Sequence, residues 1–342
     1  MLDERGEHDL LLGLPVILGE IAELSVVGFE PIQHGARKHA RTLRHTPAFL
    51  TMTDDIRAAA ARVAAAARHV RIREDAIEAY ARTIPAVAPP APDLEGADEE
   101  TRAAFSLQLN AINFGSGWFP TLRKKPGMSG FRTMEAGLRA RGPWTAAELR
   151  AIDRGEVAAV MGQDPEHELM GLYAEHLREL GTRADSFLDL ARSGDGSAER
   201  LATILAGFDG WRDVSEYGGF AVPLFKRAQI AAADLALAGI APAGDLDRLT
   251  LFADNLVPHV LRLDGVLEFD PGLVRRIEAQ ELLEHDSPEE VEIRACALHA
   301  VELLVAAHGS ASATVVDNVL WHRGGEPRYK ARPRHRARCT QY

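Results

Sequence analysis

Apolar residues recur at helical spacing along most of this chain, whereas the two-residue alternation typical of half-buried strands is scarce. For example, Ile56, Ala59, Val63 and Val70 form one apolar stripe. No rhythm of alternating strands and helices appears, and no Gly-rich dinucleotide fingerprint. We therefore predict a mostly α fold with at most a short strand or hairpin near residues 209–223. Beyond the first stripe and a second helix over residues 77–84, helices are predicted at roughly 98–113, 145–160, 165–181, 197–207, 224–238, 246–264, 271–283 and 288–307.

Charge and cysteine content limit the classes of partner. The net charge is −11 over 342 residues, so the chain lacks the broad positive surface of a general nucleic-acid-binding protein, and no DNA partner is expected. Cys296 and Cys339 form no CxxC pair, which excludes a disulfide framework and favours a reducing compartment. The apolar stretch over residues 10–18 is too short to cross a bilayer. We expect a soluble, cytoplasmic protein with no membrane contact.

Two segments interrupt the helical pattern, a Pro-rich stretch over residues 84–98 and a Gly-containing loop over residues 192–200. Neither is long enough to mark a domain boundary. Residues 51–342 are therefore expected to form one helical domain. Residues 1–50 differ in composition and are interpreted as an N-terminal extension of unknown role.

Lys226 lies near the start of an Ala-rich predicted helix and shares a face with Ile230 and Leu237. Moving an ammonium group out of water costs several kcal/mol, so a lysine on an apolar face needs an anionic partner. That partner is Asp213 or Glu216 from the preceding turn, or a ligand phosphate. A lysine that extends from the helix end to water is the alternative.

Further charged residues lie among apolar ones. Asp254 interrupts the apolar run of residues 249–261 and needs a cation or several hydrogen-bond donors; a helix-capping carboxylate fits as well as a catalytic one. In the last long predicted helix, Glu292 and Arg294 align with uncharged or apolar neighbours, which indicates paired and partly buried charges. Glu290 and Arg294 are also spaced as an ordinary surface pair.

The tail over residues 321–342 is rich in arginine and contains one acid, Glu326. It is a candidate phosphate-binding segment, and a disordered basic tail is the alternative. HExxH, P-loop and GxSxG motifs are absent. We therefore expect no metal site and no cofactor.

Eight stretches, taken in order, resemble the queuosine salvage protein family over residues 54–342. They are LNAINF (109–114), MSGFRTM (128–134), SFLDLARSGDGSAERL (186–201), WRDV (211–214), LFKRAQIAAAD (224–234), LTLFADNLVP (249–258), EEVEIRACALHAVEL (289–303) and RHRARCTQY (334–342). The resemblance implies a helical fold similar to DNA glycosylases. It also implies hydrolysis of the N-glycosidic bond of a nucleoside 5′-monophosphate, with release of a modified deazaguanine base for salvage into tRNA. The direct partner would be a small-molecule nucleotide, and tRNA would be a partner only indirectly.

The resemblance also implies roles for single residues. Asp213 would stabilise the positive charge that develops on the sugar, and Asp254 would contact the base or assist. The residues alone do not decide between these two carboxylates, nor whether Asp213 instead pairs with Lys226. The other expected binding residues are Lys226, His335, Arg338 and Tyr342 at the 5′-phosphate, Asn113 and Phe114 against the base, and Trp211 in the substrate site. Glu292 and Arg294 would support these residues without contacting the substrate.

Two other functions remain open at this point. A non-catalytic protein that binds modified nucleotides or tRNA would show affinity without turnover, and the net charge of −11 argues against it. A DNA glycosylase would need a basic DNA-binding face, and outside residues 34–45 and the tail the sequence offers none.

Overall fold

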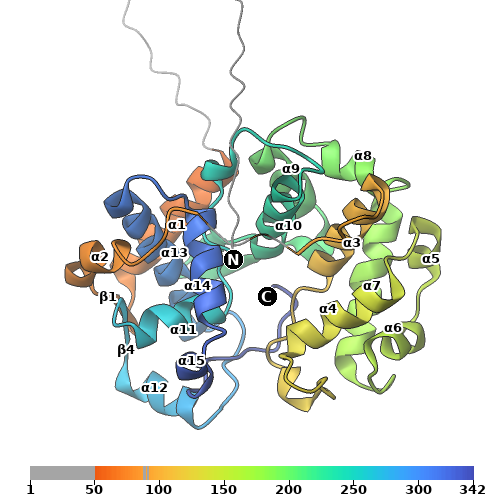
Figure 1. Ribbon diagram of the computed structural model, residues 1–342. Coiled ribbons are helices and arrows are strands. Elements are labelled where there is room, and N and C mark those ends of the chain that lie inside the picture. The colour runs from red at the N-terminus through yellow and green to blue at the C-terminus, as the bar shows by residue number, and fades with distance from the viewer. Residues whose placement is uncertain (1–50, 88–89, 91) are drawn as a thin grey trace, which may run out of the picture. The chain divides into compact units, whose positions relative to one another are not determined.

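The computed structural model describes residues 51–87, 90 and 92–342, so the predicted N-terminal extension over residues 1–50 lies outside the described residues. Within these ranges the chain forms fifteen α-helices and two small antiparallel sheets of two strands each (Figure 1). The prediction of a mostly α fold is confirmed.

The first of two hydrophobic cores comes from one continuous part of the chain. Its buried apolar side chains lie between Ala103 and Phe252. Short loops join its helices between residues 130 and 206, and longer connections span residues 112–129 and 207–225. Asp, Ser or Thr side chains accept hydrogen bonds from first-turn N–H groups at most of the helix starts. The helices are α3 (Glu99–Ala111), α4 (Gly130–Arg141), α5 (Ala146–Ala151), α6 (Arg154–Met161), α7 (Glu168–Arg183), α8 (Phe187–Arg192), α9 (Ala198–Ala206) and α10 (Lys226–Leu237).

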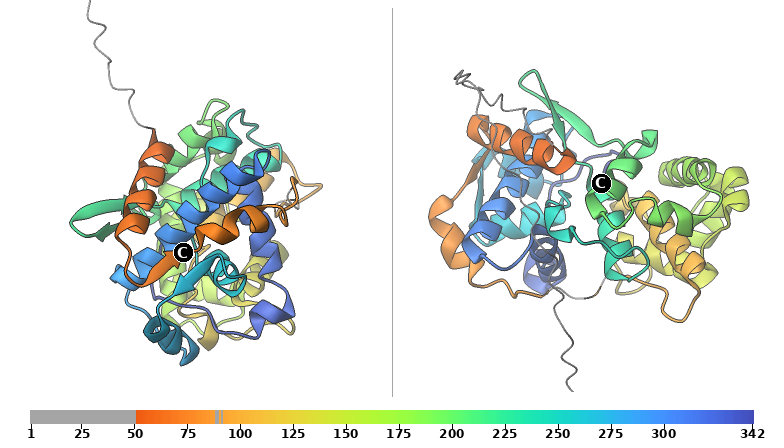
Figure 2. Two further views of the ribbon diagram at one scale, coloured as in Figure 1. Left: turned by 90° about the vertical axis from the view of Figure 1, so that its left-hand side faces the viewer. Right: turned by 90° about the horizontal axis from the view of Figure 1, so that it is seen from above.

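The second core combines segments that are far apart in the sequence. Buried side chains between Ile56 and Ile84 pack against others between Val222 and Tyr329. Figures 1 and 2 show these helices, coloured red to orange and cyan to blue, beside the group that forms the first core. They are α1 (Met52–Ala66), α2 (Glu74–Ala81), α11 (Leu256–Leu263), α12 (Pro271–Glu278), α13 (Pro288–His308), α14 (Ala313–Arg323) and α15 (Pro327–Lys330).

The predicted hairpin near residues 209–223 is present as β2 (Val214–Tyr217) and β3 (Phe220–Pro223), and it extends outward in both views of Figure 2. A second pair of strands was not predicted. In it β1 (Val70–Ile72) is antiparallel to β4 (Leu267–Phe269). Strands of three residues are too short to show alternation, and their pairing joins distant parts of the chain.

The prediction of one helix over residues 246–264 is wrong. The structure has a 3-10 turn, η3 (Leu246–Arg248), then extended chain, and α11 begins only at Leu256. The reason is Asp254, whose Oδ1 accepts hydrogen bonds from the N–H groups of Leu256 and Val257 at 2.7 and 3.1 Å. A side chain that bonds to the first turn starts a helix and therefore lies outside it.

Two further predictions of helices differ from the structure. The predicted helix over residues 145–160 is divided into α5 and α6, because Asp153 caps the second helix. Helices α4 and α14 were not predicted, and both contribute to the cavity described below. The two other 3-10 turns are η1 (Phe119–Thr121) and η2 (Asp209–Trp211).

In the described ranges, no helix taken singly has both the length and the apolar character needed to cross a bilayer. Helices α13 and α14 meet those criteria only when joined, and they are bent by 112° relative to each other.

Candidate active site

A cavity lies where the two cores meet. It has two adjoining compartments, each of about 610 Å³. The first core contributes α3, α4 and α10, and the second contributes α14 and the extended chain before α11. Nine residues line both compartments, among them Lys226 and Asp254, so these two side chains lie at the boundary.

The two compartments differ in charge. The acidic compartment is lined by six carboxylates, namely Asp93, Glu95, Glu135, Asp234, Asp254 and Asp317, with three cationic side chains, Arg132, Arg139 and Lys226. The basic compartment is lined by five cationic side chains, namely Arg132, Arg139, Lys226, Lys330 and Arg334, with two carboxylates. A ligand that is anionic at one end and cationic or hydrogen-bond-donating at the other matches this polarity.

Lys226 is the first residue of α10 and is buried. Its Nζ donates a hydrogen bond to the carbonyl oxygen of Asn113 at 2.9 Å. Burial lowers its pKa to about 8, against the opposing effect of the Asp254 and Asp317 carboxylates. The sequence predicted that this lysine needs an anionic partner, and the structure gives it nearby carboxylates but no direct ion pair within the described part of the chain.

Asp254 has two differently placed oxygens. Its Oδ1 is held by the N–H groups at the start of α11, and no residue in the described ranges bonds to Oδ2. The side chain is half-buried and lines both compartments. This gives a fixed carboxylate with one oxygen available to a ligand in the cavity.

Asp213 takes a different position. It is 2 % exposed and lines neither compartment. Both of its oxygens accept hydrogen bonds from the Arg294 guanidinium, at 3.0 and 2.7 Å, and Oδ2 also accepts from the backbone N–H of Lys226 at 3.0 Å. Such a bidentate pair fully engages the carboxylate. Asp213 therefore binds the backbone of Lys226, and its charge is balanced by Arg294 and not by the Lys226 ammonium.

Arg294 extends this network to Asp254. Its Nε donates to the carbonyl oxygen of Ala253 at 3.0 Å, and its guanidinium lies 4.4 Å from the centre of the Tyr342 ring. The buried pair of Asp213 and Arg294 thus fixes the start of α10 and the residue before Asp254. It determines where the two boundary residues of the cavity lie.

Two further carboxylates of the acidic compartment were not predicted as site residues. Asp234 lies on α10 two turns after Lys226, about 12 Å along the helix axis. It accepts a hydrogen bond from Asn110 at 2.9 Å, and burial raises its pKa to about 7. Asp317 lies on α14, where it accepts the Phe252 N–H at 3.3 Å. Burial, and next the Asp254 carboxylate, raise the pKa of Asp317 well above its usual value.

Comparison with known proteins identifies the family of this chain. A family model described as "Queuosine salvage protein" matches residues 96–342, which is more than half of the chain. The chain belongs to the queuosine salvage protein family. Three of its relatives carry the name queuosine 5′-phosphate N-glycosylase/hydrolase. The one from Sphaerobacter thermophilus is 35% identical over 308 residues, or 82% of this chain and 95% of the relative. The mouse protein is 29% identical over 57% of this chain and 63% of its own length, and the Schizosaccharomyces pombe protein 33% over 40% and 41%.

The C-terminal block of the family resemblance, residues 334–342, crosses between the cores. The Gly115 N–H donates to the Tyr342 carbonyl oxygen at 3.1 Å, and Tyr342 lines the basic compartment. The predicted phosphate residues His335 and Arg338 do not line the cavity. His335 is buried, which lowers its pKa to about 3, and the exposed Arg338 lies 3.5 Å from Glu168.

The cationic residue of this block that lines the cavity is Arg334. No hydrogen bond or ion pair joins its side chain to another residue in the described ranges. Burial lowers the pKa of Arg334, and the Asp254 carboxylate opposes this effect. Ser116 lines the same compartment with a buried hydroxyl that has no partner within those ranges. The next residue, Gly117, packs so closely on Ala337 that an added Cβ would lie 2.4 Å from the Ala337 carbonyl oxygen. Alternation within RHRAR places Arg334, Arg336 and Arg338 on one face, so the sequence pattern alone does not identify Arg334 as the residue at the cavity.

Asn113 and Phe114, predicted to contact the base, line the cavity, whereas Trp211, predicted in the substrate site, does not. Asn113 lines both compartments, and Phe114 lines the basic one, with its ring centre 5.1 Å from that of Tyr173 in an edge-to-face arrangement. The buried Arg227 guanidinium separates Trp211 from Phe114, and it lies 5.4 and 5.0 Å from the centres of the Trp211 and Phe114 rings. The aromatic side chains that line the acidic compartment are Phe131, Phe252, Trp321 and His322.

Glu292 supports the fold away from the cavity. Its Oε2 accepts hydrogen bonds from three successive N–H groups, residues 68–70, at 2.6 to 3.0 Å, and Oε1 accepts from the Tyr217 hydroxyl at 2.7 Å. It joins α13 to the end of α1 and to the hairpin. The buried charge predicted for Glu292 is present, and its partners are backbone N–H groups rather than a cation.

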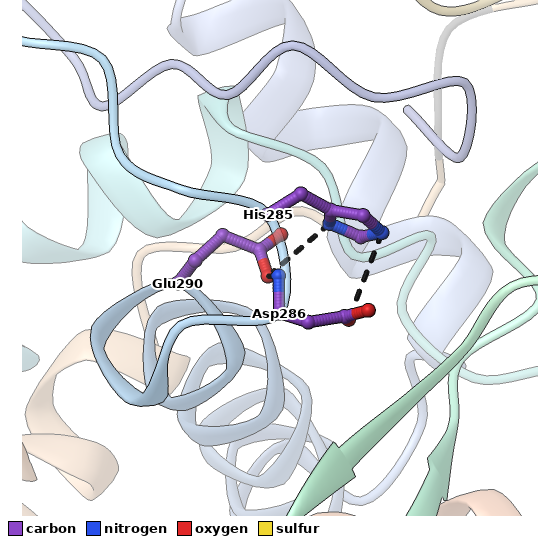
Figure 3. Close-up of side chains that lie close together, drawn as sticks. All are labelled: His285, Asp286 and Glu290. Atoms are coloured by element: carbon purple, nitrogen blue, oxygen red, sulfur yellow. Dashed lines mark hydrogen bonds and ion pairs between the residues drawn. The ribbon is translucent and has the colours of Figure 1, made fainter.

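One cluster among the described residues has the composition of a metal site. Ligand atoms of His285, Asp286 and Glu290 lie within 4.8 Å of one another. Figure 3 shows the imidazole between the carboxylates, with Nδ1 3.6 Å from Glu290 and Nε2 3.6 Å from Asp286. Burial opposes protonation of His285, but the two carboxylates outweigh it and raise its pKa. Because each nitrogen faces a different carboxylate, the geometry suits an imidazolium that bridges two anions better than a metal ion. None of the three residues lines the cavity.

Proposed function

We propose that this protein hydrolyses the N-glycosidic bond of queuosine 5′-phosphate, or of a closely related nucleoside 5′-phosphate, and releases the free base and ribose 5-phosphate. The observation that carries the proposal is Asp254. It is a carboxylate with one oxygen fixed by a helix start and the other free, at the boundary of an acidic and a basic compartment. The names of the relatives supply the substrate class.

The chemistry fits the position of Asp254 better than that of Asp213. Cleavage of a glycosidic bond leaves positive charge on the sugar, and a carboxylate beside C1′ stabilises that charge and orients the attacking water. Asp213 already forms a bidentate ion pair and does not face the cavity. We therefore assign the sugar to Asp254, and we assign to Asp213 the positioning of Lys226.

The remaining parts of the substrate match the two compartments. The 5′-phosphate would lie in the basic compartment near Lys226, Arg334 and the Ser116 hydroxyl, with Tyr342 beside it. The base would lie in the acidic compartment against Trp321 and Phe131, whose ring centres are 6.1 Å apart. The base of queuosine carries a protonatable amine, which suits the carboxylates that line this compartment.

The activity is tested by incubating the full chain with a panel of nucleoside 5′-monophosphates that includes queuosine 5′-phosphate. We expect queuine and ribose 5-phosphate in equal amounts, detected by liquid chromatography and mass spectrometry. Binding of queuosine 5′-phosphate or tRNA without release of any base would instead support a non-catalytic binding protein and contradict the proposal.

Replacing Arg334 by alanine is expected to raise the Kd for ribose 5-phosphate about 10-fold or more, because a guanidinium that pairs with phosphate contributes about 1.5–3 kcal/mol. Isothermal titration calorimetry gives the Kd. The matched control is Arg338→Ala in the same C-terminal segment, which removes an exposed guanidinium outside the cavity and should leave the Kd within twofold. Equal losses in the two variants would contradict the placement of the phosphate.

The affinity for ribose 5-phosphate should also depend on pH through Lys226. Burial lowers the pKa of this lysine to about 8, so its charge, present at pH 7, is lost as the pH rises through that value. We expect the Kd to rise between pH 7.5 and pH 9.5, where the phosphate is already a dianion. In Lys226→Met the Kd should be higher and nearly constant over this interval. A wild-type Kd that does not change with pH would show that Lys226 does not contact the phosphate.

We further propose that the protein acts in the cytoplasm, in keeping with its two free, buried cysteines, and that it meets tRNA only through the salvaged base.

A further inference from the structure

Asp317 is a buried carboxyl group of the cavity without an assigned role. It lies on α14, is 6 % exposed and lines the acidic compartment. Its Oδ1 accepts the Phe252 N–H at 3.3 Å, and Oδ2 has no partner within the described part of the chain. No cation there forms an ion pair with it, because the ammonium of Lys226 is bonded to the Asn113 carbonyl. Asp317 is thus held in place with one oxygen free toward the cavity.

The surroundings of Asp317 favour its neutral form. Asp254 and Asp234 line the same compartment, and two negative charges near a third carboxyl oppose its ionisation. Burial has the same effect and is the largest cause of the raised pKa of Asp317; Lys226 and the Phe252 N–H only partly oppose it. A neutral carboxyl group has an O–H and donates a hydrogen bond or a proton, whereas the helix-capped Asp254 accepts. Asp317 and Asp254 therefore differ in environment as an acid and a carboxylate do.

The proposed reaction needs such a donor. When the bond between C1′ and N9 breaks, its electron pair goes to the base, which is a poor leaving group as an anion. In an ordinary purine, N7 can take a proton and relieve this charge. A 7-deazaguanine has carbon at position 7, so the nearest ring nitrogen that can accept a proton is N3, which is separated from N9 by C4. The acid must therefore reach the edge of the base that faces the sugar, close to the carboxylate that faces C1′.

We propose that Asp317 is the general acid of the reaction, and that it protonates N3 of the departing base while Asp254 faces C1′. This inference rests on the proposed function. The C1′–N9 bond breaks, its electron pair goes to the base, and the Asp317 proton moves to N3. The oxygen of water forms the new bond to C1′, and one proton of that water passes to Asp254. Proton exchange with solvent moves the base proton from N3 to N9 and returns Asp254 and Asp317 to their starting forms.

The test compares two substrates that differ in their need for an acid. Queuosine 5′-phosphate requires protonation of the base, whereas 4-nitrophenyl β-D-ribofuranoside 5-phosphate releases nitrophenolate, a stable anion. In Asp317→Asn, kcat for queuosine 5′-phosphate should fall about 10²- to 10⁴-fold, the usual contribution of a general acid. With the nitrophenyl substrate it should fall less than about 10-fold. Asp254→Asn should lose activity with both substrates, and Asp247→Asn, which removes an exposed carboxylate outside the cavity, with neither.

The pH profile of the wild type provides a second readout that needs no variant. With queuosine 5′-phosphate, kcat should fall at alkaline pH as Asp317 loses its proton, and with the nitrophenyl substrate this fall should be absent. Equal losses with both substrates in a folded Asp317→Asn, or the same alkaline fall with both in the wild type, would overturn the role of Asp317 and leave the proposed function intact. Failure of the wild type to cleave queuosine 5′-phosphate would overturn both.

Discussion

Asp254→Asn is expected to lower kcat for queuosine 5′-phosphate by about 10³-fold or more while KM changes little. The substitution removes the negative charge that faces the developing charge of the sugar, an interaction made mainly in the transition state. It keeps an oxygen that can accept the N–H groups of Leu256 and Val257, so the start of α11 should persist. Steady-state kinetics with detection of the released base measures the effect.

A melting curve separates this effect from unfolding, and Tm should stay within a few degrees of the wild type. Asp247→Asn serves as the control for the loss of one negative charge from the surface. If Asp254→Asn kept kcat within about threefold of the wild type, Asp254 would not be the carboxylate at the sugar.

The second large effect is on stability. Asp213→Ala is expected to lower the free energy of unfolding by about 3–5 kcal/mol, because it leaves the guanidinium of Arg294 buried without its bidentate partner. Arg294→Met should have a similar effect, since it leaves the Asp213 carboxylate buried and unpaired. Urea denaturation followed by circular dichroism gives the free energies.

Two controls sharpen this result. The double variant Asp213→Leu/Arg294→Met should recover part of the loss, because no buried charge remains unpaired. Arg200→Ala removes a pair in which Arg200 and Asp195 are 61% and 69% exposed, and it should cost less than about 1 kcal/mol. Should Asp213→Ala lose activity at unchanged stability, the carboxylate would act on the substrate, as the sequence had suggested, and not on the fold.

The sequence predicted the fold class and the helices with a clear apolar stripe. It also predicted that Lys226 and Asp254 are functional candidates, because each is a charge within an apolar pattern. These features are local, so they can be read without tertiary information. The sequence could not decide between Asp213 and Asp254. That decision depends on Arg294, which lies 81 residues after Asp213 and forms the pair that turns Asp213 away from the cavity.

The acid at residue 317 was missed for a related reason. Helix α14 mixes apolar and polar residues without a clear apolar stripe, and within it Asp317 and Trp321 are spaced one turn apart. Only the packing of α14 opposite α10 shows that these two side chains line a cavity. His335 and Arg338 were chosen from a basic tail in which every second residue is charged or polar. The register of that extended segment, which directs Arg334 inward to the cavity, depends on its contacts with both cores.

The two cores also differ in how far apart in the sequence their contacting residues lie. The first uses residues 103–252 without interruption, so it can form from local contacts as soon as that part of the chain exists. The second needs contacts such as that of the Arg68 N–H with Glu292, 224 residues later, and closing so long a loop is slow and costs conformational entropy. Because the cavity requires α10 from one core and α14 from the other, catalytic competence is a late event in folding. We expect the acid and the carboxylate of the site to come together only once the second core has formed.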